Sequence, residues 1–265
     1  MRAVPGFSGT AILTCVTIFT IALVAAIPVA ATAQSKILAL DSATGLTLRN
    51  AVATPVSFKG KQALKLTVSP EAEARMAAER PPAAKKGGPK QAGGPPAGER
   101  GSLGPLAIVD GLEFSNGTIE LDLTGEPGAG AAGGARGFVG VAFRIQPDGK
   151  TYDCFYVRPT NGRADDQDRR NHSAQYVSHP VYTWFKLREE TPSRYESYVD
   201  ILPAEWIHLK IDVNGDKARL YVNGNEQPTL IVNDVKSGAG AKGSVALWFE
   251  GSTIAHYANL KITPQ

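Results

Sequence analysis

Apolar and polar residues alternate along much of this chain, and this period of two constrains the fold more than any other feature. The pattern is clearest at 139–145, where Val, Val, Phe and Ile occupy every second position, and it recurs at 207–213. Such alternation is typical of antiparallel strands with one buried face. Asn-Gly pairs at 214–215 and 223–224 supply the positive φ angles of tight turns after strands. The sequence therefore predicts an all-β fold.

Many other short segments carry the same strand signals, and no long helical pattern competes with them. We therefore predict a two-sheet antiparallel β-sandwich, because stacking two sheets buries both inner faces. A Gly- and Ala-rich stretch at 125–137 is expected to form a flexible hairpin loop between two strands. The additional candidate strands are 36–41, 54–58, 62–69, 105–110, 117–123, 151–158, 173–178, 183–188, 195–200, 228–233, 243–249 and 254–263.

Residues 70–103 differ in composition from the rest of the chain, because they consist mainly of Ala, Pro, Gly, Lys and Glu and contain no aromatic residue. Such a segment cannot bury enough apolar surface to offset its ordering entropy, so we expect a disordered insertion with at most a short helix at 71–80. Its six Lys or Arg against four Glu, together with Arg2, account for the net charge of +3. The folded part is then near neutral, which argues against nucleic acid as a partner.

The first 33 residues have the organisation of an export signal. Arg2 precedes an apolar run at 11–31, and Ala31-Thr32-Ala33 has the small-x-small form that signal peptidase recognises. We expect cleavage after residue 33, a secreted or periplasmic mature protein without a membrane span, and a single β-sandwich domain over 34–265. An uncleaved N-terminal anchor is the alternative, since the apolar run is long enough to cross a bilayer. Cleavage leaves Cys154 as the only cysteine, so no intramolecular disulfide is expected.

Strand alternation also separates a core face from a face that combines aromatic and charged side chains. Tyr156 and Arg158 fall opposite to Phe155 in one strand, and Trp248 falls opposite to Phe249 in another. Aromatic rings pack against the C–H patches of sugars, and charged or amide side chains bind sugar hydroxyls. This face therefore predicts carbohydrate as the partner. The alternative is that the aromatic residues are ordinary cross-strand pairs on a covered sheet.

The segment 159–180 is rich in Asp, Arg and His and contains few aliphatic residues. We expect it to form the rim of a ligand groove, with Arg144, Arg158 and Glu196 converging at the same end of the sheet. The candidate catalytic residues are His172, His179 and Glu196. The candidate substrate-binding residues are Arg144, Tyr156, Arg158, Asn161, Arg163, Asp166, Gln167, Tyr198, Trp248 and Glu250.

No metal or cofactor site is predicted. Asp165, Asp166 and Asp168 offer oxygen ligands that make calcium the alternative, but their spacing does not match an EF-hand loop. Neither candidate histidine has local zinc-ligand spacing, and the chain contains no serine nucleophile elbow and no Walker-type phosphate loop.

Three stretches carry a family resemblance: GFVGVAFRIQPDGKTYDCFYVRPTNGRADDQDRRNHSAQYVSHPVYTWFKLR, WIHLKIDVNGDKARLYVNG and GSVALWFEGSTIAHYANLKI. Over about residues 105–263 the chain resembles secreted bacterial proteins of the 3-keto-disaccharide hydrolase domain family, within the concanavalin A-like lectin/glucanase superfamily. The resemblance implies a laminin-G-like jelly-roll sandwich and hydrolysis of glycosides that carry a ketone at C3.

This implied chemistry requires a base, a partner for the enolate and help for the leaving group. A ketone at C3 acidifies the C2 proton, so a positioned base can remove it and expel the glycosidic oxygen at C1, after which water adds. The candidates for these three roles, in that order, are His172 or His179, Arg158 or Arg163, and Glu196 or Tyr198. A non-catalytic, lectin-like carbohydrate-binding module is the alternative function.

Overall fold

The computed structural model describes residues 1–3, 6, 9, 34–78, 104–131 and 133–265. All of the strands fall within the unit Thr32–Gln265. The expected signal at 1–33 lies largely outside the described residues. Of the expected insertion at 70–103, residues 79–103 also lie outside them. None of the helices in the described ranges is long and apolar enough to cross a membrane.

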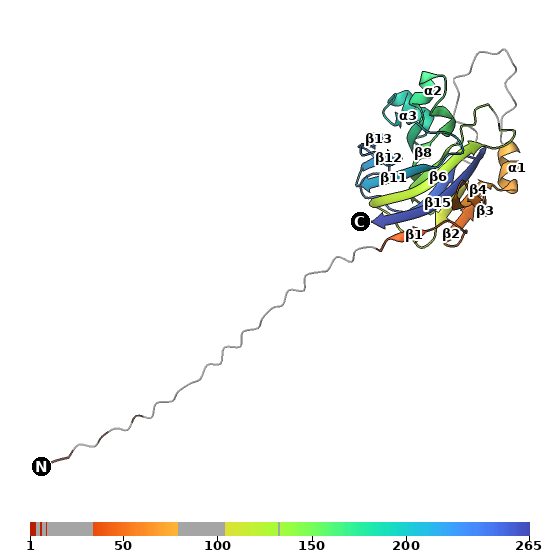
Figure 1. Cartoon of the computed structure of the whole chain (residues 1–265). Helices are drawn as coiled ribbons and strands as arrows, with labels where there is room; N and C mark the ends of the chain where they lie inside the picture. The colour runs from red at the N-terminus through yellow and green to blue at the C-terminus, as the bar shows by residue number, and fades with distance from the viewer. Residues whose placement is uncertain (4–5, 7–8, 10–33, 79–103, 132) are drawn as a thin grey trace. The chain divides into compact units, whose positions relative to one another are not determined.

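The strands form two antiparallel sheets, which confirms the predicted β-sandwich. In the first sheet the order is β13 (Leu230–Val232), β12 (Lys217–Val222), β11 (Ile207–Asn214), β6 (Gly117–Pro127), β15 (Thr253–Pro264), β4 (Lys61–Val68) and β3 (Ala51–Phe58), with β1 (Lys36–Leu38) on β15. In the second sheet the order is β10 (Glu196–Ser197), β9 (Ala174–His179), β8 (Tyr152–Val157), β7 (Val139–Ile145), β14 (Ser244–Phe249), β5 (Leu106–Val109) and β2 (Leu46–Arg49). Figure 1 shows β6 and β15 side by side along the centre of the first sheet.

The hydrophobic core contains one face of each sheet. Leu121 on β6 and Leu209 on β11 lie opposite each other in register, and both are fully buried. On the second sheet Phe143 and Phe155 stack with ring centroids 6.2 Å apart. Burying one such side chain contributes about 2–3 kcal/mol. Alternation in the sequence is therefore explained by this shared core.

The second sheet is buried on both faces at its centre. Every residue of β7 and β8 is buried, whereas burial alternates along β11 in the first sheet. Aromatic side chains on the outer face of the second sheet stack on one another, and helix α3 (Trp184–Glu190) contacts β9. The outer face is therefore a second packing surface, with its polar groups enclosed.

The predicted tight turns are present. β11 and β12 pair up to Asn214 and Lys217, and Gly215 between them has φ +61°. Asn223 and Gly224 both have positive φ, at +54° and +73°. A short helix also occurs where the sequence suggests one, since α1 spans Pro70–Ala78.

Two of the predicted strands are wrong or shorter than expected. Residues 183–188 form most of helix α3 instead of a strand, and the candidate strand 195–200 contains only the two residues of β10. Within α3, Trp184 and Leu187 lie three positions apart, so both fall on one side of a helix. Helix α3 itself has no β-branched residue and ends in Lys, Leu, Arg and Glu, which favour helix over strand, while Thr183 occupies the N-cap position. The other helical segments are η2 (Pro159–Asn161) and α2 (Gln167–Asn171).

The predicted hairpin loop at 125–137 is also wrong, because it connects strands of different sheets. β6 continues to Pro127 in the first sheet, and the chain then crosses to β7 in the second sheet. Gly125 and Gly137 allow the close crossing, since a Cβ on Gly125 would lie 2.3 Å from the carbonyl oxygen of Gly137. Composition indicates a flexible connection here, but it does not indicate which strands are joined.

Candidate functional site

One row of side chains crosses the outer face of the second sheet. Pairing in register places Glu196 opposite Gln175, Gln175 opposite Tyr156, Tyr156 opposite Gly140, and Gly140 opposite Trp248. Residues opposite one another in antiparallel strands project to the same face. Because Gly140 has no side chain, the Tyr156 and Trp248 rings meet across it and stack, with centroids 4.8 Å apart and planes 26° apart.

The polar end of this row is a cluster of four side chains, Arg158, His172, Arg188 and Glu196, which we call the glutamate cluster. Arg188 donates from Nε to Oε2 of Glu196 at 3.0 Å and from Nη2 to Oε1. Nδ1 of His172 lies 2.9 Å from Oε2, and Nη1 of Arg158 lies 3.7 Å from Oε1. The Glu196 side chain is 3 % exposed, whereas those of His172 and Arg188 are 26 % and 34 % exposed. Solvent therefore reaches the cluster from the side of His172 and Arg188.

Arg158 connects the residues of the cluster through several hydrogen bonds. It follows β8 directly, and its guanidinium donates to the carbonyl oxygen of His172 at 2.7 Å, to the Tyr156 hydroxyl at 3.0 Å and to Oε1 of Gln175 at 3.0 Å. Asn161 adds a hydrogen bond from Nδ2 to the same His172 carbonyl at 3.3 Å. With these bonds and only 5 % of its surface exposed, Arg158 positions His172 and is not free to bind substrate.

Glu196 is ionised in this environment. Burial acts to raise the pKa of its carboxyl, but the contact with His172, the hydrogen bonds from Arg188 and the charges of Arg188 and Arg158 outweigh burial and lower the pKa to about 2. Nδ1 of His172 faces this carboxylate at 2.9 Å, although the contact does not have the geometry of a full hydrogen bond. The adjacent negative charge favours the tautomer with a proton on Nδ1. Nε2 of His172 is then the nitrogen that can accept a proton.

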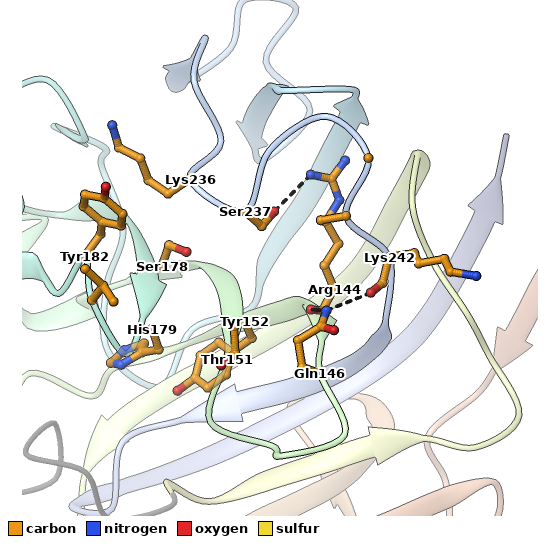
Figure 2. Close-up of a pocket in the computed structure, with 13 residues that line it drawn as sticks. Arg144, Gln146, Thr151, Tyr152, Ser178, His179, Tyr182, Lys236, Ser237 and Lys242 are labelled. Carbon is orange, nitrogen blue, oxygen red and sulfur yellow. Dashed lines mark hydrogen bonds between the residues drawn. The ribbon is translucent and has the colours of Figure 1, made fainter.

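A separate hollow of about 410 Å³ lies at the other end of β9 and is shown in Figure 2. Its wall includes His179, Tyr152, Tyr182, Ser178 and Lys236. The rings of His179 and Tyr152 lie side by side, with centroids 4.9 Å apart. Burial lowers the pKa of His179 to about 4, so this imidazole is neutral at physiological pH.

The two candidate catalytic histidines are therefore in different places. His172 comes just before β9 and joins the glutamate cluster, whereas His179 is the last residue of β9 and faces the hollow. The six-residue strand separates them by roughly 17 Å at about 3.3 Å per residue.

Comparison with known proteins identifies the family. Residues 95–263 match the family described as the 3-keto-alpha-glucoside-1,2-lyase-like domain. The chain belongs to this family. The family resemblance predicted from the sequence is therefore confirmed, and the glutamate cluster and the hollow both lie within the lyase-like domain.

Several solved structures resemble the chain at low sequence identity. The carbohydrate-binding module CBM66 from Bacillus subtilis is 16 % identical, with 83 % of this chain and 96 % of that chain covered and a TM-score of 0.46. The Bacillus licheniformis β-glucanase is 15 % identical, with 87 % and 98 % covered and a TM-score of 0.44. A Bacillus subtilis protein of unknown function with a galectin-like fold is 10 % identical, with 86 % and 94 % covered and a TM-score of 0.49. No curated protein matches the chain.

Arg144 of the lyase-like domain does not converge on the glutamate cluster, contrary to expectation. It has φ +54°, and the partner strand β14 shifts register between Ser244 and Ala246 at this point. The side chain is fully buried and donates to the carbonyl oxygens of Ser115 and Gly215. Figure 2 shows its guanidinium next to Ser237 at the hollow. The positive φ interrupts the alternation on which the prediction depended.

The predicted binding residues of the segment 163–167 make local contacts. Arg163 pairs with Asp200 at 2.6 Å on the exposed surface, and Asp166 caps α2 by accepting from the backbone N–H of Arg169 at 3.1 Å. Gln167 donates to Asn171 within the same helix at 2.8 Å. No group of three His, Cys, Asp or Glu side chains that could hold a metal ion occurs within the described residues.

The remaining predicted binding residues lie at opposite ends of the row. Tyr198 is 41 % exposed, accepts a hydrogen bond from Arg170 at 3.0 Å and lies under that guanidinium. Glu250 follows β14 and accepts from the backbone N–H of Ser252 at 2.9 Å and from its hydroxyl. Tyr198 is therefore partly exposed and paired with Arg170, whereas Glu250 stabilises a turn.

Sequence reasoning missed two members of the site. Gln175 is fully buried opposite Tyr156, and the amide between Ala174 and Tyr176 inside the predicted strand 173–178 is the signal that could have identified it. Arg188 was hidden by the wrong strand assignment of 183–188. Had that segment been read as a helix, Arg188 would have fallen one turn from Trp184, over whose ring its guanidinium lies at 4.7 Å.

Proposed function

We propose that this protein cleaves glycosides that carry a ketone at C3, by base-assisted elimination at the glutamate cluster. The observation that carries the proposal is the contact between the ionised Glu196 and Nδ1 of His172. Carboxylate–histidine pairs of this kind orient the imidazole and make its other nitrogen a better base. Membership of the lyase-like family supports the same chemistry.

In the proposed reaction, Nε2 of His172 removes the proton on C2. The electrons of the broken C–H bond form the C1–C2 double bond as the C1–O bond breaks, and the enolate at C3 shares the charge during this change. The proton that His172 gains passes to the departing oxygen. Water then adds across the double bond, so the balance is one water consumed, one alcohol released and one 3-keto sugar released. Such acid–base help is worth about 10²- to 10⁴-fold in rate.

The charges of the cluster assign the other roles. Glu196 stays ionised, so it stabilises the imidazolium of His172 and does not act as the acid. Arg188 is the cluster's more exposed guanidinium, so it is the group that we place beside the enolate oxygen. Arg158 is a positioning residue because its donors are bonded to protein groups.

The test is release of nitrophenol from a nitrophenyl 3-keto-glucoside. We expect His172→Asn to lower kcat by at least about 100-fold, since it removes the base. His208→Asn is the matched control, because His208 lies on the first sheet, where its Nδ1 is 3.0 Å from Asp122. Circular dichroism establishes that both variants are folded. Equal activity of the wild type and the His172 variant would refute the proposal, and saturable sugar binding without turnover would instead indicate a lectin-like module.

We also infer that the mature protein is exported. The inference depends on the apolar run and the small-x-small site in residues 1–33. After cleavage, the unit that carries the site would begin at Gln34 and form one β-sandwich domain.

A further inference from the structure

Two arginines lie next to the glutamate cluster without belonging to it. Arg136 is in the crossing between β6 and β7, and its carbonyl oxygen accepts from the backbone N–H of Thr160 at 3.3 Å. Arg169 is in α2, and its Nη2 donates to the carbonyl oxygen of Thr160 at 3.3 Å and to Oδ1 of Asn161 at 3.4 Å. Segments far apart in the sequence thus bring two guanidinium-bearing residues to the same residue, Thr160. We call Arg136 and Arg169 the arginine pair.

Within the part of the chain that the structure describes, no acidic side chain contacts the arginine pair. There, Arg136 donates to the backbone oxygens of Gly133 and Ala135, at 2.7 and 2.9 Å. Neither arginine of the pair makes an ion pair with any carboxylate within the described ranges. By contrast, Arg163 in the same segment pairs with Asp200 through two nitrogens. The arginine pair is therefore a concentration of positive charge that forms no direct ion pair among the described residues.

The surroundings destabilise the positive charge of Arg136 when no anion is bound. Burial lowers the pKa of Arg136, and the nearby charges of Arg169 and Arg158 lower it further. Nε of Arg169 and Oγ1 of Thr160 are buried and have no hydrogen-bond partner among the described residues. An anion near these groups would relieve the repulsion between like charges and accept charge-assisted hydrogen bonds.

A short chain of hydrogen bonds connects the arginine pair to the proposed base. Asn161 accepts from Arg169 through Oδ1 and donates through Nδ2 to the carbonyl oxygen of His172. Arg158 donates to the same carbonyl oxygen. One amide side chain thus separates Arg169 from the backbone of His172, which places the arginine pair beside the segment that carries the proposed base.

We propose that the arginine pair is an anion subsite and that the substrate is an acidic sugar derivative, with a carboxylate or a sulfate group held by Arg136 and Arg169. The proposal rests on the proposed function for the position of the sugar at His172. Arginine suits this role because its planar fork binds carboxylate and sulfate oxygens through two parallel hydrogen bonds. The proposed subsite determines which sugar is selected, and His172 performs the proton transfer.

The experiment is isothermal titration calorimetry with three probes: methyl glucoside, methyl glucuronide and methyl glucoside 6-sulfate. We expect at least one anionic probe to bind wild type about 10- to 100-fold more tightly than the neutral probe, as hydrogen bonds between charged groups allow. Arg169→Gln and Arg136→Gln should each remove most of this preference and leave the affinity for methyl glucoside unchanged. Arg163→Gln is the matched control, because Arg163 lies on the same segment and already has Asp200 as its partner.

The outcomes separate this proposal from the proposed function. His172→Asn should keep the anion preference, so loss of turnover together with retained binding leaves the anion subsite supported. A preference for the glucuronide assigns the carboxylate, and a preference for the sulfate assigns the sulfate ester. Equal affinity of wild type for all three probes overturns the proposal. The same is true if Arg163→Gln reduces the anion preference as much as Arg169→Gln does.

Discussion

Replacing Glu196 by Gln removes the charge at the centre of the glutamate cluster and keeps the shape of the side chain. The folded protein prefers the ionised carboxylate, because its pKa falls from the ordinary value of 4.5 to about 2. This difference corresponds to about 3 kcal/mol at 1.36 kcal/mol per unit of pKa, and solvent around the partly exposed Arg188 reduces the expected effect to about 2 kcal/mol. We therefore expect Glu196→Gln to lower the free energy of unfolding by about 2 kcal/mol at neutral pH.

The stabilisation has a defined dependence on pH. It is fully present above pH 4.5, where the carboxyl is ionised in the unfolded chain as well, and it is lost as the pH falls toward 2, where the folded protein takes up the proton. Urea unfolding of the wild type and the Glu196→Gln variant at pH 7 and pH 3 measures the difference in their free energies of unfolding at each pH. We expect the difference between the two proteins to fall by about half or more at pH 3.

The matched control is Glu190→Gln. Glu190 pairs with Lys186 one turn away at 3.7 Å, and both side chains are exposed, so the loss should stay within about 0.5 kcal/mol at either pH. A stability difference for Glu196→Gln that is absent, or that does not change between pH 7 and pH 3, would refute the reasoning. In that case Glu196 would not be held as an anion, and it could not orient His172 as proposed.

Two further predictions concern the second sheet and the N-terminus. Gly140→Ala would place a Cβ 2.1 Å from the carbonyl oxygen of Phe155 and 2.6 Å from Cα of Tyr156, so we expect a loss of at least about 2 kcal/mol in urea unfolding. Gly104→Ala, with no atom within 4 Å of the added Cβ, is the control, and equal stability of the two variants would contradict the close packing. For the N-terminus, mass spectrometry of protein recovered outside the cytoplasm should show a chain that begins at Gln34, whereas an intact residue 1 would favour the anchor.

The sequence predicts the fold well because a period of two leaves little choice of structure. Eleven of the twelve additional candidate strands overlap observed strands, and the Asn-Gly pairs mark turns as expected. The errors occur where local pattern and tertiary context differ. A stretch such as 183–188 is short and apolar at its start, so periodicity alone does not separate strand from helix. The crossing at 125–137 depends on which sheet the next strand joins, and that information is not local.

The site is less predictable than the fold, because alternation assigns a residue to a face but not to a neighbour. Tyr156, Arg158, Glu196 and Trp248 were expected on one face, and the structure brings them into one row. Arg144 was expected with them, but one residue with positive φ turns it toward the loops between the sheets. His172 and His179 could not be distinguished from sequence, because nothing in the sequence shows which end of β9 carries the carboxylate.

The arrangement also explains how an edge strand of two residues can hold a buried charge. β10 has few backbone bonds of its own, so Glu196 depends on side chains from other segments to stay in place. Arg188 bonds both carboxylate oxygens of Glu196. Arg158 orders the residues around it, since one planar guanidinium binds the carbonyl of His172, the hydroxyl of Tyr156 and the amide of Gln175 at the same time. A lysine would supply the same charge but not three bonds in fixed directions. Precise positioning of His172 therefore comes from a residue that is itself too buried to contact a substrate.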